Sequence, residues 1–231
     1  MNLAIKVFQI LNFSFRFLFG NKVNEKKLLK KYLQNKKITY LDIGANVGND
    51  IDFIKKIFNK NKLDIHAFEP IEDLAKKLEE KHKDITVNNL AISNEQNAKM
   101  FYESKISSQS SLNKNLDNPL KIPTKEYLVE TNTLKNYILE KNITHIDLIK
   151  IDTEGHDYEV LESLGNFYNY VKINLIKLEF LFNNQNFKDN MNFNKIIQLL
   201  YKYNFEILAI PNLKHINNEL FLADVYFKNT K

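Results

Sequence analysis

Three side chains capable of acid–base chemistry follow one strongly apolar stretch. Asp152, Glu154 and His156 come at or just after the end of HIDLIKID, residues 145–152, whose β-branched and apolar residues predict a buried parallel strand. Ligands of open α/β sheets bind at the carboxyl ends of the strands. A neutral imidazole can accept a proton near neutral pH. The pattern therefore predicts a catalytic site in which His156 can act as a general base.

Other uses of these residues remain open. Asp152 and Thr153 can instead cap the helix predicted to start near Gly155. Glu154 can orient a substrate or bind a cation. Glu179, in the next predicted strand KINLIKLEF, is expected to face the same cleft and contact substrate. Asp152, Glu154 and Glu179 have the oxygens that Mg²⁺ prefers, but no fixed-spacing motif supports a divalent metal.

A glycine turn follows an earlier predicted strand. In YLDIGANVGNDIDFI, residues 40–54, Gly44 and Gly48 separate a β-favouring run from an apolar-periodic segment. Strand, tight turn and helix N-terminus is how α/β proteins present backbone N–H groups to a small ligand. The dinucleotide fingerprint G-x-G-x-x-G has glycine where this chain has Asn46, and no Lys-Ser/Thr follows, which excludes a nucleoside-triphosphate P-loop. The turn predicts a ligand without phosphate there.

An acidic residue ends the next predicted strand. Glu69, in LDIHAFEP, comes 25 residues after Gly44. A carboxylate there can accept hydrogen bonds from both hydroxyls of a ribose. Glu69 can also simply start the next helix before Pro70, because negative charge favours a helix N-terminus. The glycine turn and the Glu69 carboxylate follow adjacent predicted strands, and together they favour a nucleoside site.

Strand-like and helix-like segments alternate from about residue 37, which predicts an α/β fold with a doubly wound sheet covered on both faces. DITVNNLAIS, residues 84–93, is predicted as a third strand, and NFEILAI and LFLADVYFK as an antiparallel closing pair. We predict one domain over 37–231 after an N-terminal helical extension over 1–36. The predicted helical stripes are Val47, Ile51, Ile54 and Phe58; Ile71, Leu74, Ala75 and Leu78; and Val160, Leu161 and Leu164 before Gly165.

The composition is that of a soluble globular protein, with 44% hydrophobic and 26% charged residues. Lysines interleave with acidic residues, as in EDLAKKLEEKHK, so the net charge of +5 indicates a solvated surface rather than a nucleic-acid partner. The absence of cysteine excludes disulfides, thiolate chemistry and Cys-based zinc sites. We expect a cytoplasmic protein.

The first nineteen residues, MNLAIKVFQILNFSFRFLF, are apolar but interrupted by polar and charged residues. No uninterrupted apolar span of about 18 residues exists, and no signal-peptide cleavage site follows. We expect residues 1–19 to form a helix that packs on the domain or on a second subunit, with peripheral membrane contact as the alternative.

DIGANVG, FEP, NNLAIS and IDLIKIDTEGHDYEVLESL together resemble the FkbM family of S-adenosylmethionine-dependent methyltransferases over roughly residues 38–182. KIDTEGH is the most family-specific piece, whereas DIGANVG alone points to the wider class I methyltransferase fold. The resemblance implies a Rossmann-like, mostly parallel seven-stranded sheet with a reversed last strand. It also implies O-methylation, commonly of sugar hydroxyls or natural-product alcohols.

The resemblance further implies roles for single residues. Asp42, Gly44 and Gly48 would lie along the methionine moiety, Glu69 at the ribose and residues 88–91 near the adenine. Ser110 and Ser111 match a serine-rich stretch before the family's substrate loop. Family members commonly have an acidic residue after the Leu of a TL motif, where this chain has Lys135 and Asn136. The predicted cofactor-binding residues are Asp42, Gly44, Asn46, Gly48, Glu69, Asn89, Ala91 and Asp152.

We therefore expect an O-methyltransferase that uses S-adenosylmethionine and a small-molecule or glycan acceptor, with the polar segment 103–123 as a lid over the acceptor. A nicotinamide-dependent oxidoreductase is the enzymatic alternative, which Asn46 disfavours. A catalytically inactive nucleoside-binding scaffold that tethers partners through its N-terminal helix is the other alternative.

Overall fold

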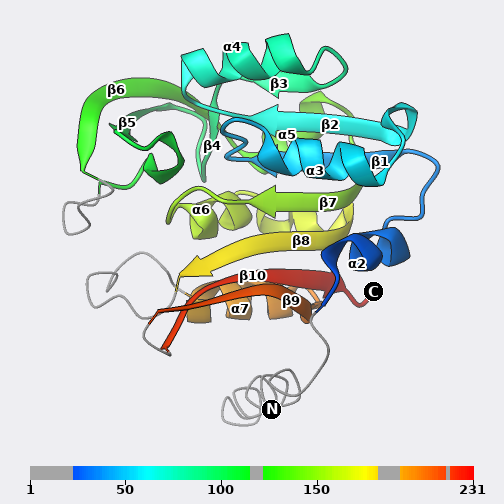
Figure 1. The fold of residues 1–231 in the computed structure, drawn as a ribbon. Coiled ribbons are helices and arrows are strands. Elements are labelled where there is room, and N and C mark those ends of the chain that lie inside the picture. The colour runs from blue at the N-terminus through cyan, green and yellow to red at the C-terminus, as the bar shows by residue number, and fades with distance from the viewer. Residues whose placement is uncertain (1–22, 115–121, 182–192, 217–218) are drawn as a thin grey trace.

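The computed structural model describes residues 23–114, 122–181, 193–216 and 219–231, and every structural statement below concerns these residues. A seven-stranded sheet forms the centre of the fold (Figure 1). Its strands, in spatial order, are β3 (Thr86–Asn88), β2 (Leu63–Phe68), β1 (Ile38–Ile43), β7 (His145–Ile151), β8 (Lys172–Leu181), β10 (Glu219–Asn229) and β9 (Phe205–Ile216).

Neighbouring strands run parallel except at β10, which is antiparallel to both β8 and β9. The predicted α/β class, the mostly parallel sheet and its reversed last strand are confirmed. The closing hairpin is formed by β9 and β10, as their β-favouring sequences indicated.

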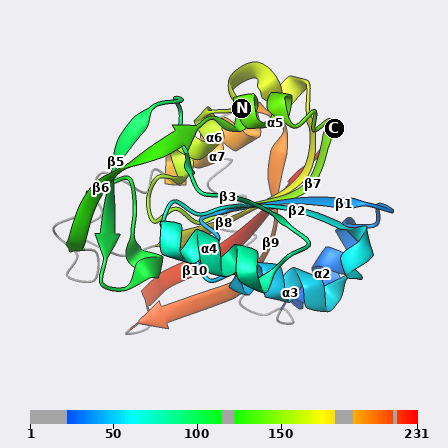
Figure 2. The ribbon, with the colours of Figure 1, turned by 90° about the horizontal axis from the view of Figure 1, so that it is seen from above.

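Helices cover both faces of the sheet (Figure 2). Alternation along β1 shows why: Tyr40 packs into the core on one face, while Leu41 and Ile43 pack into the core on the other. Both faces of a central strand therefore need a covering layer. One layer contains α2 (Glu25–Tyr32), α3 (Asn49–Ile57) and α4 (Glu72–Lys81), and the other α5 (Leu134–Glu140), α6 (Asp157–Glu162) and α7 (Phe193–Lys202).

A second sheet was not predicted. It contains β4 (Ala91–Ile92), β6 (Pro123–Asn132) and β5 (Ala98–Ser104), in that spatial order. The predicted third strand over 84–93 is therefore wrong in its second half, because the chain leaves the central sheet after Asn88. The Asn89 side chain fixes this exit by donating to the carbonyls of Glu69 and Pro70, at 2.9 and 3.1 Å.

Two further differences concern helices. Val47, predicted to lie on an apolar helical face, precedes α3 and is 45% exposed, because Gly48 takes a φ of +81° and the helix begins at Asn49. Helix α7 had no counterpart among the predicted elements.

The N-terminal part of the described chain is integrated into the domain. Leu29 of α2 and Leu33 after it are buried in the same core as Ile38 of β1. Residues 1–19 lie outside the described residues, so their contact with a second subunit or a membrane remains a prediction. No helix of the described ranges is long and apolar enough to cross a membrane.

Leu29→Ala should lower the free energy of unfolding by about 2–5 kcal/mol, because the removed side chain is fully buried and leaves a cavity beneath α2. The same substitution at Leu139, half exposed on α5, should cost no more than about 0.5 kcal/mol. Urea unfolding followed by circular dichroism measures both. Equal losses in the two variants would contradict the docking of α2 on the core.

Candidate active site

A cavity lies at the carboxyl ends of β1, β2 and β7. Nine predicted site residues line it: Gly44, Asn46, Glu69, Ala91, Ser110, Ser111, Asp152, Glu154 and His156. Phe68, Ile71, Leu90 and Ile92 add apolar wall. Asp42 of β1, Gly48 at the N-cap of α3 and Asn89 after β3 do not line the cavity. The predicted residues lie together because β1, β2 and β7 are parallel, so the residues that follow these strands lie at the same edge of the sheet.

Glycine is required at position 44 by close packing. Its φ is +78°, and a Cβ there would lie 2.0 Å from the carbonyl oxygen of Asp152. The backbone after β1 thus passes directly against the backbone after β7. Gly48 is constrained differently, since a Cβ there would lie 2.7 Å from the Leu78 side chain. Gly44 therefore sets the width of the site, and Gly48 packs α3 on α4.

Glu69 bridges the glycine turn and the start of α4. Its carboxylate accepts hydrogen bonds from the backbone N–H groups of Asn46 (2.8 Å) and Ile71 (2.9 Å), and the residue is 4% exposed. Burial raises the pKa of Glu69 to about 7, although both hydrogen bonds oppose that rise. The site thus holds a carboxylate poised to exchange its proton near neutral pH.

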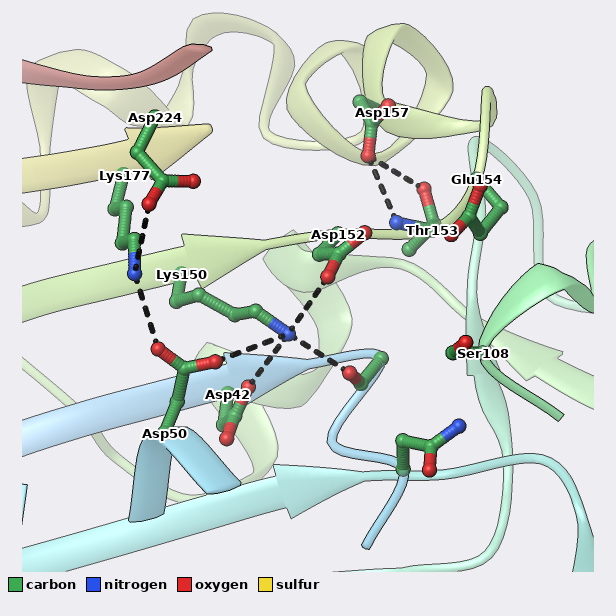
Figure 3. Close-up of polar contacts among 12 residues, drawn as sticks. Asp42, Asp50, Ser108, Lys150, Asp152, Thr153, Glu154, Asp157, Lys177 and Asp224 are labelled. Carbon is green, nitrogen blue, oxygen red and sulfur yellow. Dashed lines mark hydrogen bonds and ion pairs between the residues drawn. The ribbon is translucent and has the colours of Figure 1, made fainter. Parts of the chain in front are cut away.

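Lys150 occupies the centre of this edge of the sheet (Figure 3). Its buried ammonium donates to the Gly44 carbonyl at 2.8 Å and lies 3.3 Å from a carboxylate oxygen of Asp42. It also lies 3.5 Å from Asp152 and 3.9 Å from Asp50. Burial alone would lower the pKa of Lys150, but the three carboxylates outweigh burial and raise it, so the lysine stays charged.

Lys177 of β8 extends this network. Its ammonium lies 3.0 Å from Asp50 and 3.9 Å from Asp224 (Figure 3). It also lies 3.3 Å from Glu25. Burial would raise the pKa of Asp50, but Lys177 and Lys150 together lower it. No group of three or more histidines, aspartates and glutamates in the described ranges is arranged to hold a metal ion. The carboxylates at this edge are paired with two lysines, Lys150 and Lys177.

The loop after β7 is held in an unusual conformation. Glu154 and Gly155 both have positive φ angles, +55° and +105°. The Thr153 N–H and hydroxyl both donate to the Asp157 carboxylate, at 2.9 and 2.8 Å. His156 is the N-cap position of α6, so the alternative in which Asp152 and Thr153 cap that helix is wrong. The loop instead turns Glu154 toward the cavity.

His156 is buried, and both ring nitrogens have neighbours. Nε2 lies 3.0 Å from the Ser93 hydroxyl and Nδ1 lies 3.4 Å from the Asn113 amide oxygen. Burial, followed by the nearby charge of Lys99, lowers the pKa of His156 to about 4. The imidazole is neutral at pH 7 but is a weak base. Its predicted role as general base remains a prediction.

The first half of the predicted lid lies across the cavity. Ser107 contacts the Asn46 amide at 3.2 Å, Gln109 donates to Glu154 at 2.9 Å, and Ser111 donates to the Thr153 carbonyl at 3.0 Å. The enclosed space is about 70 Å³, well below the roughly 300 Å³ or more of ordinary small-molecule sites. Nucleoside binding therefore requires residues 104–114 to move outward. Residues 115–121 lie outside the described ranges.

Glu179 lies farther along the same edge, in a separate cavity with Asp224. Sequence reasoning missed both Lys150 and Lys177, as well as Asp50 and Asp224. One signal was present: a lysine inside an apolar strand, as in HIDLIKID, has to be paired if it is buried.

The sequence model of the methyltransferase FkbM domain matches residues 42–207. None of the curated proteins is significantly similar in sequence to the chain.

Two solved structures share the fold. The CurJ carbon methyltransferase superposes with a TM-score of 0.53 at 10% identity, over 89% of this chain and 52% of that one. Methyltransferase FkbM from Methylobacillus flagellatus KT superposes with a TM-score of 0.52 at 14% identity, over 83% of this chain and 44% of that one. The present chain thus spans about half the length of either protein, and identities this low show fold alone.

Gly44→Ala should cost more than about 4 kcal/mol of stability, because its Cβ would overlap backbone. Gly165→Ala is the matched control: its φ is +51°, but no atom lies within 4 Å of the added carbon. That variant should lose only about 1–2 kcal/mol, the cost of a left-handed alanine. Thermal unfolding measures both. Similar losses would contradict the close approach of the two loops.

Proposed function

The chain belongs to the FkbM methyltransferase family, and on that premise we propose that it methylates a hydroxyl oxygen of a sugar or glycoconjugate precursor. The resemblance indicated by the sequence motifs is thereby confirmed at the level of the family, whose methyl donor is S-adenosylmethionine. The acceptor and the oxygen that receives the methyl group are the parts proposed here.

The arrangement of Glu69 fits a nucleoside. The carboxylate lies between the glycine turn and an apolar wall that includes Ile71 and Leu90. A carboxylate can accept from two ribose hydroxyls while the apolar wall packs against a base. This is the single observation that best supports the cofactor assignment.

The same arrangement disfavours a dinucleotide. A pyrophosphate needs free backbone N–H groups at the turn, whereas the Asn46 N–H is already donated to Glu69. Asn46 also carries a side chain where the dinucleotide fingerprint requires glycine. The nicotinamide alternative therefore lacks its binding element in the described turn.

Residues of this chain contribute to methyl transfer in two ways, and the acceptor adds a further requirement. S-adenosylmethionine, when bound, supplies a methyl group on a positively charged sulfur. Residues 104–114 lie across the cavity. After moving outward to admit the donor, they would exclude water on closing over it again, which favours transfer over hydrolysis. Asp152 and Glu154 bring negative charge to the same cavity, which favours a positively charged donor. The acceptor hydroxyl must also lose its proton, because an alcohol is a very weak acid.

Isothermal titration calorimetry with S-adenosylhomocysteine should give micromolar binding, with no binding of NAD. Glu69→Gln should weaken this affinity by about tenfold or more, because a charged acceptor for two hydroxyls is lost. Wild-type affinity should fall from pH 8 to pH 6, since the pKa of Glu69 is about 7 and protonation removes that acceptor.

Glu72→Gln is the matched control, because Glu72 lies exposed in the first turn of α4 and does not line the cavity. Its affinity should equal that of the wild type. A folded protein that does not bind S-adenosylhomocysteine, or that binds NAD instead, would contradict the proposed function.

A further inference from the structure

A second cavity lies beside the first on the same edge of the sheet. Its volume is about 410 Å³, and its polar lining comes from β8, β9 and β10. Glu179, Asp224 and Asn212 are register partners across these three strands, so their side chains form one row on one face. Lys214 and Leu222 complete the wall. Carboxylate, amide and ammonium groups in one hollow provide acceptors and donors for a polyhydroxylated ligand.

Asp152 lies in the wall between the first cavity and a third hollow. This residue lines the first cavity and also a hollow narrower than the second cavity, which it shares with Lys150, Lys177 and Glu179. Glu179 in turn lines both the narrower hollow and the second cavity. The shared residues thus place the second cavity and the first on either side of one hollow, an arrangement that suits an acceptor site near a methyl-donor site.

Glu179 differs from its acidic neighbours in being uncompensated. Asp224 accepts from Asn212 at 2.6 Å and lies near Lys177, and Asp152 lies near Lys150. No ion pair joins Glu179 to a basic side chain among the described residues. Its carboxylate is available to a ligand.

The surroundings also make Glu179 a strong base for a carboxylate. Burial raises its pKa to about 8, and the charges of Asp152, Asp224 and Glu154 add to the rise. The charge of Lys214 opposes this rise in the pKa. Lys150 and Lys177, in the narrower hollow, are paired with other carboxylates. By contrast His156, with a pKa of about 4, is both weaker and engaged at both nitrogens.

We propose that the second cavity holds the methyl acceptor and that Glu179 takes the proton from the hydroxyl that is methylated. This inference rests on the proposed function. The acceptor oxygen forms a bond to the methyl carbon as the bond from that carbon to sulfur breaks, leaving S-adenosylhomocysteine. The hydroxyl proton goes to the Glu179 carboxylate. Glu179 is then a catalytic residue, and Asn212 and Lys214 bind other hydroxyls of the acceptor.

The test uses methyl glucoside, galactoside, rhamnoside and fucoside as acceptor probes, with transfer of a radiolabelled methyl group as the activity readout. Glu179→Gln should slow transfer by about 100-fold, the usual contribution of a general base. The wild-type rate should rise with pH to a plateau above about pH 8, because only ionised Glu179 accepts a proton. With S-adenosylmethionine at saturating concentration, so that the titration of Glu69 does not change the rate, that rise should be absent from Glu179→Gln.

Two binding measurements accompany the rates. Calorimetry with S-adenosylhomocysteine should give the same affinity for Glu179→Gln as for the wild type, which shows that the variant is folded. Saturation-transfer NMR should detect the methylated glycoside on both proteins in the presence of S-adenosylhomocysteine. Asn212→Trp, which fills the cavity from edge strand β9, should abolish that signal. Glu206→Gln, exposed on β9, is the matched control and should behave as wild type.

Each outcome decides between the two proposals. A wild-type protein that methylates a glycoside, with Glu179→Gln equally fast and equally pH-dependent, overturns the role of Glu179 and leaves the proposed function standing. A glycoside signal that persists in Asn212→Trp overturns the cavity assignment. A wild-type protein that binds S-adenosylhomocysteine but methylates none of the four glycosides overturns the proposed sugar acceptor, and this inference with it.

Discussion

The fold depends at its functional edge on one buried charge, the ammonium of Lys150. Placing a charge in a strand interior costs several kcal/mol unless it is paired and hydrogen-bonded. Lys150 is paired with Asp42 of β1, with Asp152 after its own strand, and more distantly with Asp50 of α3. Its hydrogen bond to the Gly44 carbonyl fixes the glycine turn as well. One side chain therefore positions both loops that form the cavity, and the left-handed Gly44 lets those loops touch.

This constraint shapes the chemistry of the site. Carboxylates gather along the edge from β1 to β10, and the two buried lysines compensate most of them. Glu154 lines the first cavity instead, and Glu179 lines the second. Such a distribution suits the proposed reaction, in which a positively charged methyl donor meets a hydroxyl and a proton is released. Histidine, the obvious base in the sequence, is neutral and enclosed instead.

The central sheet, the glycine turn and most residues of the first cavity could be predicted from the sequence. The periodicity of apolar residues and the residues at strand ends both depend on local structure. Glu69 and Asp152 were found since each ends a strand that parallel pairing brings to one edge. The small sheet of β4, β5 and β6 was missed, because its pairing of β4 with β6 joins segments about forty residues apart, beyond the reach of local patterns. The roles of Lys150 and Lys177 were missed for the same reason, since their partners come from other strands and helices. His156 lost basicity through burial, which residue type alone does not reveal.

The central claim is that Lys150 aligns the two loops, and a double-mutant cycle tests it most directly. Lys150→Met should destabilise the protein by about 3–5 kcal/mol, because it leaves Asp42 buried without compensation. Adding Asp42→Asn removes that charge and should restore much of the stability. The folded double variant should still bind S-adenosylhomocysteine at least about tenfold more weakly than the wild type, since the Gly44 carbonyl has lost its anchor. A Lys150→Met protein with wild-type stability and wild-type affinity would contradict the account.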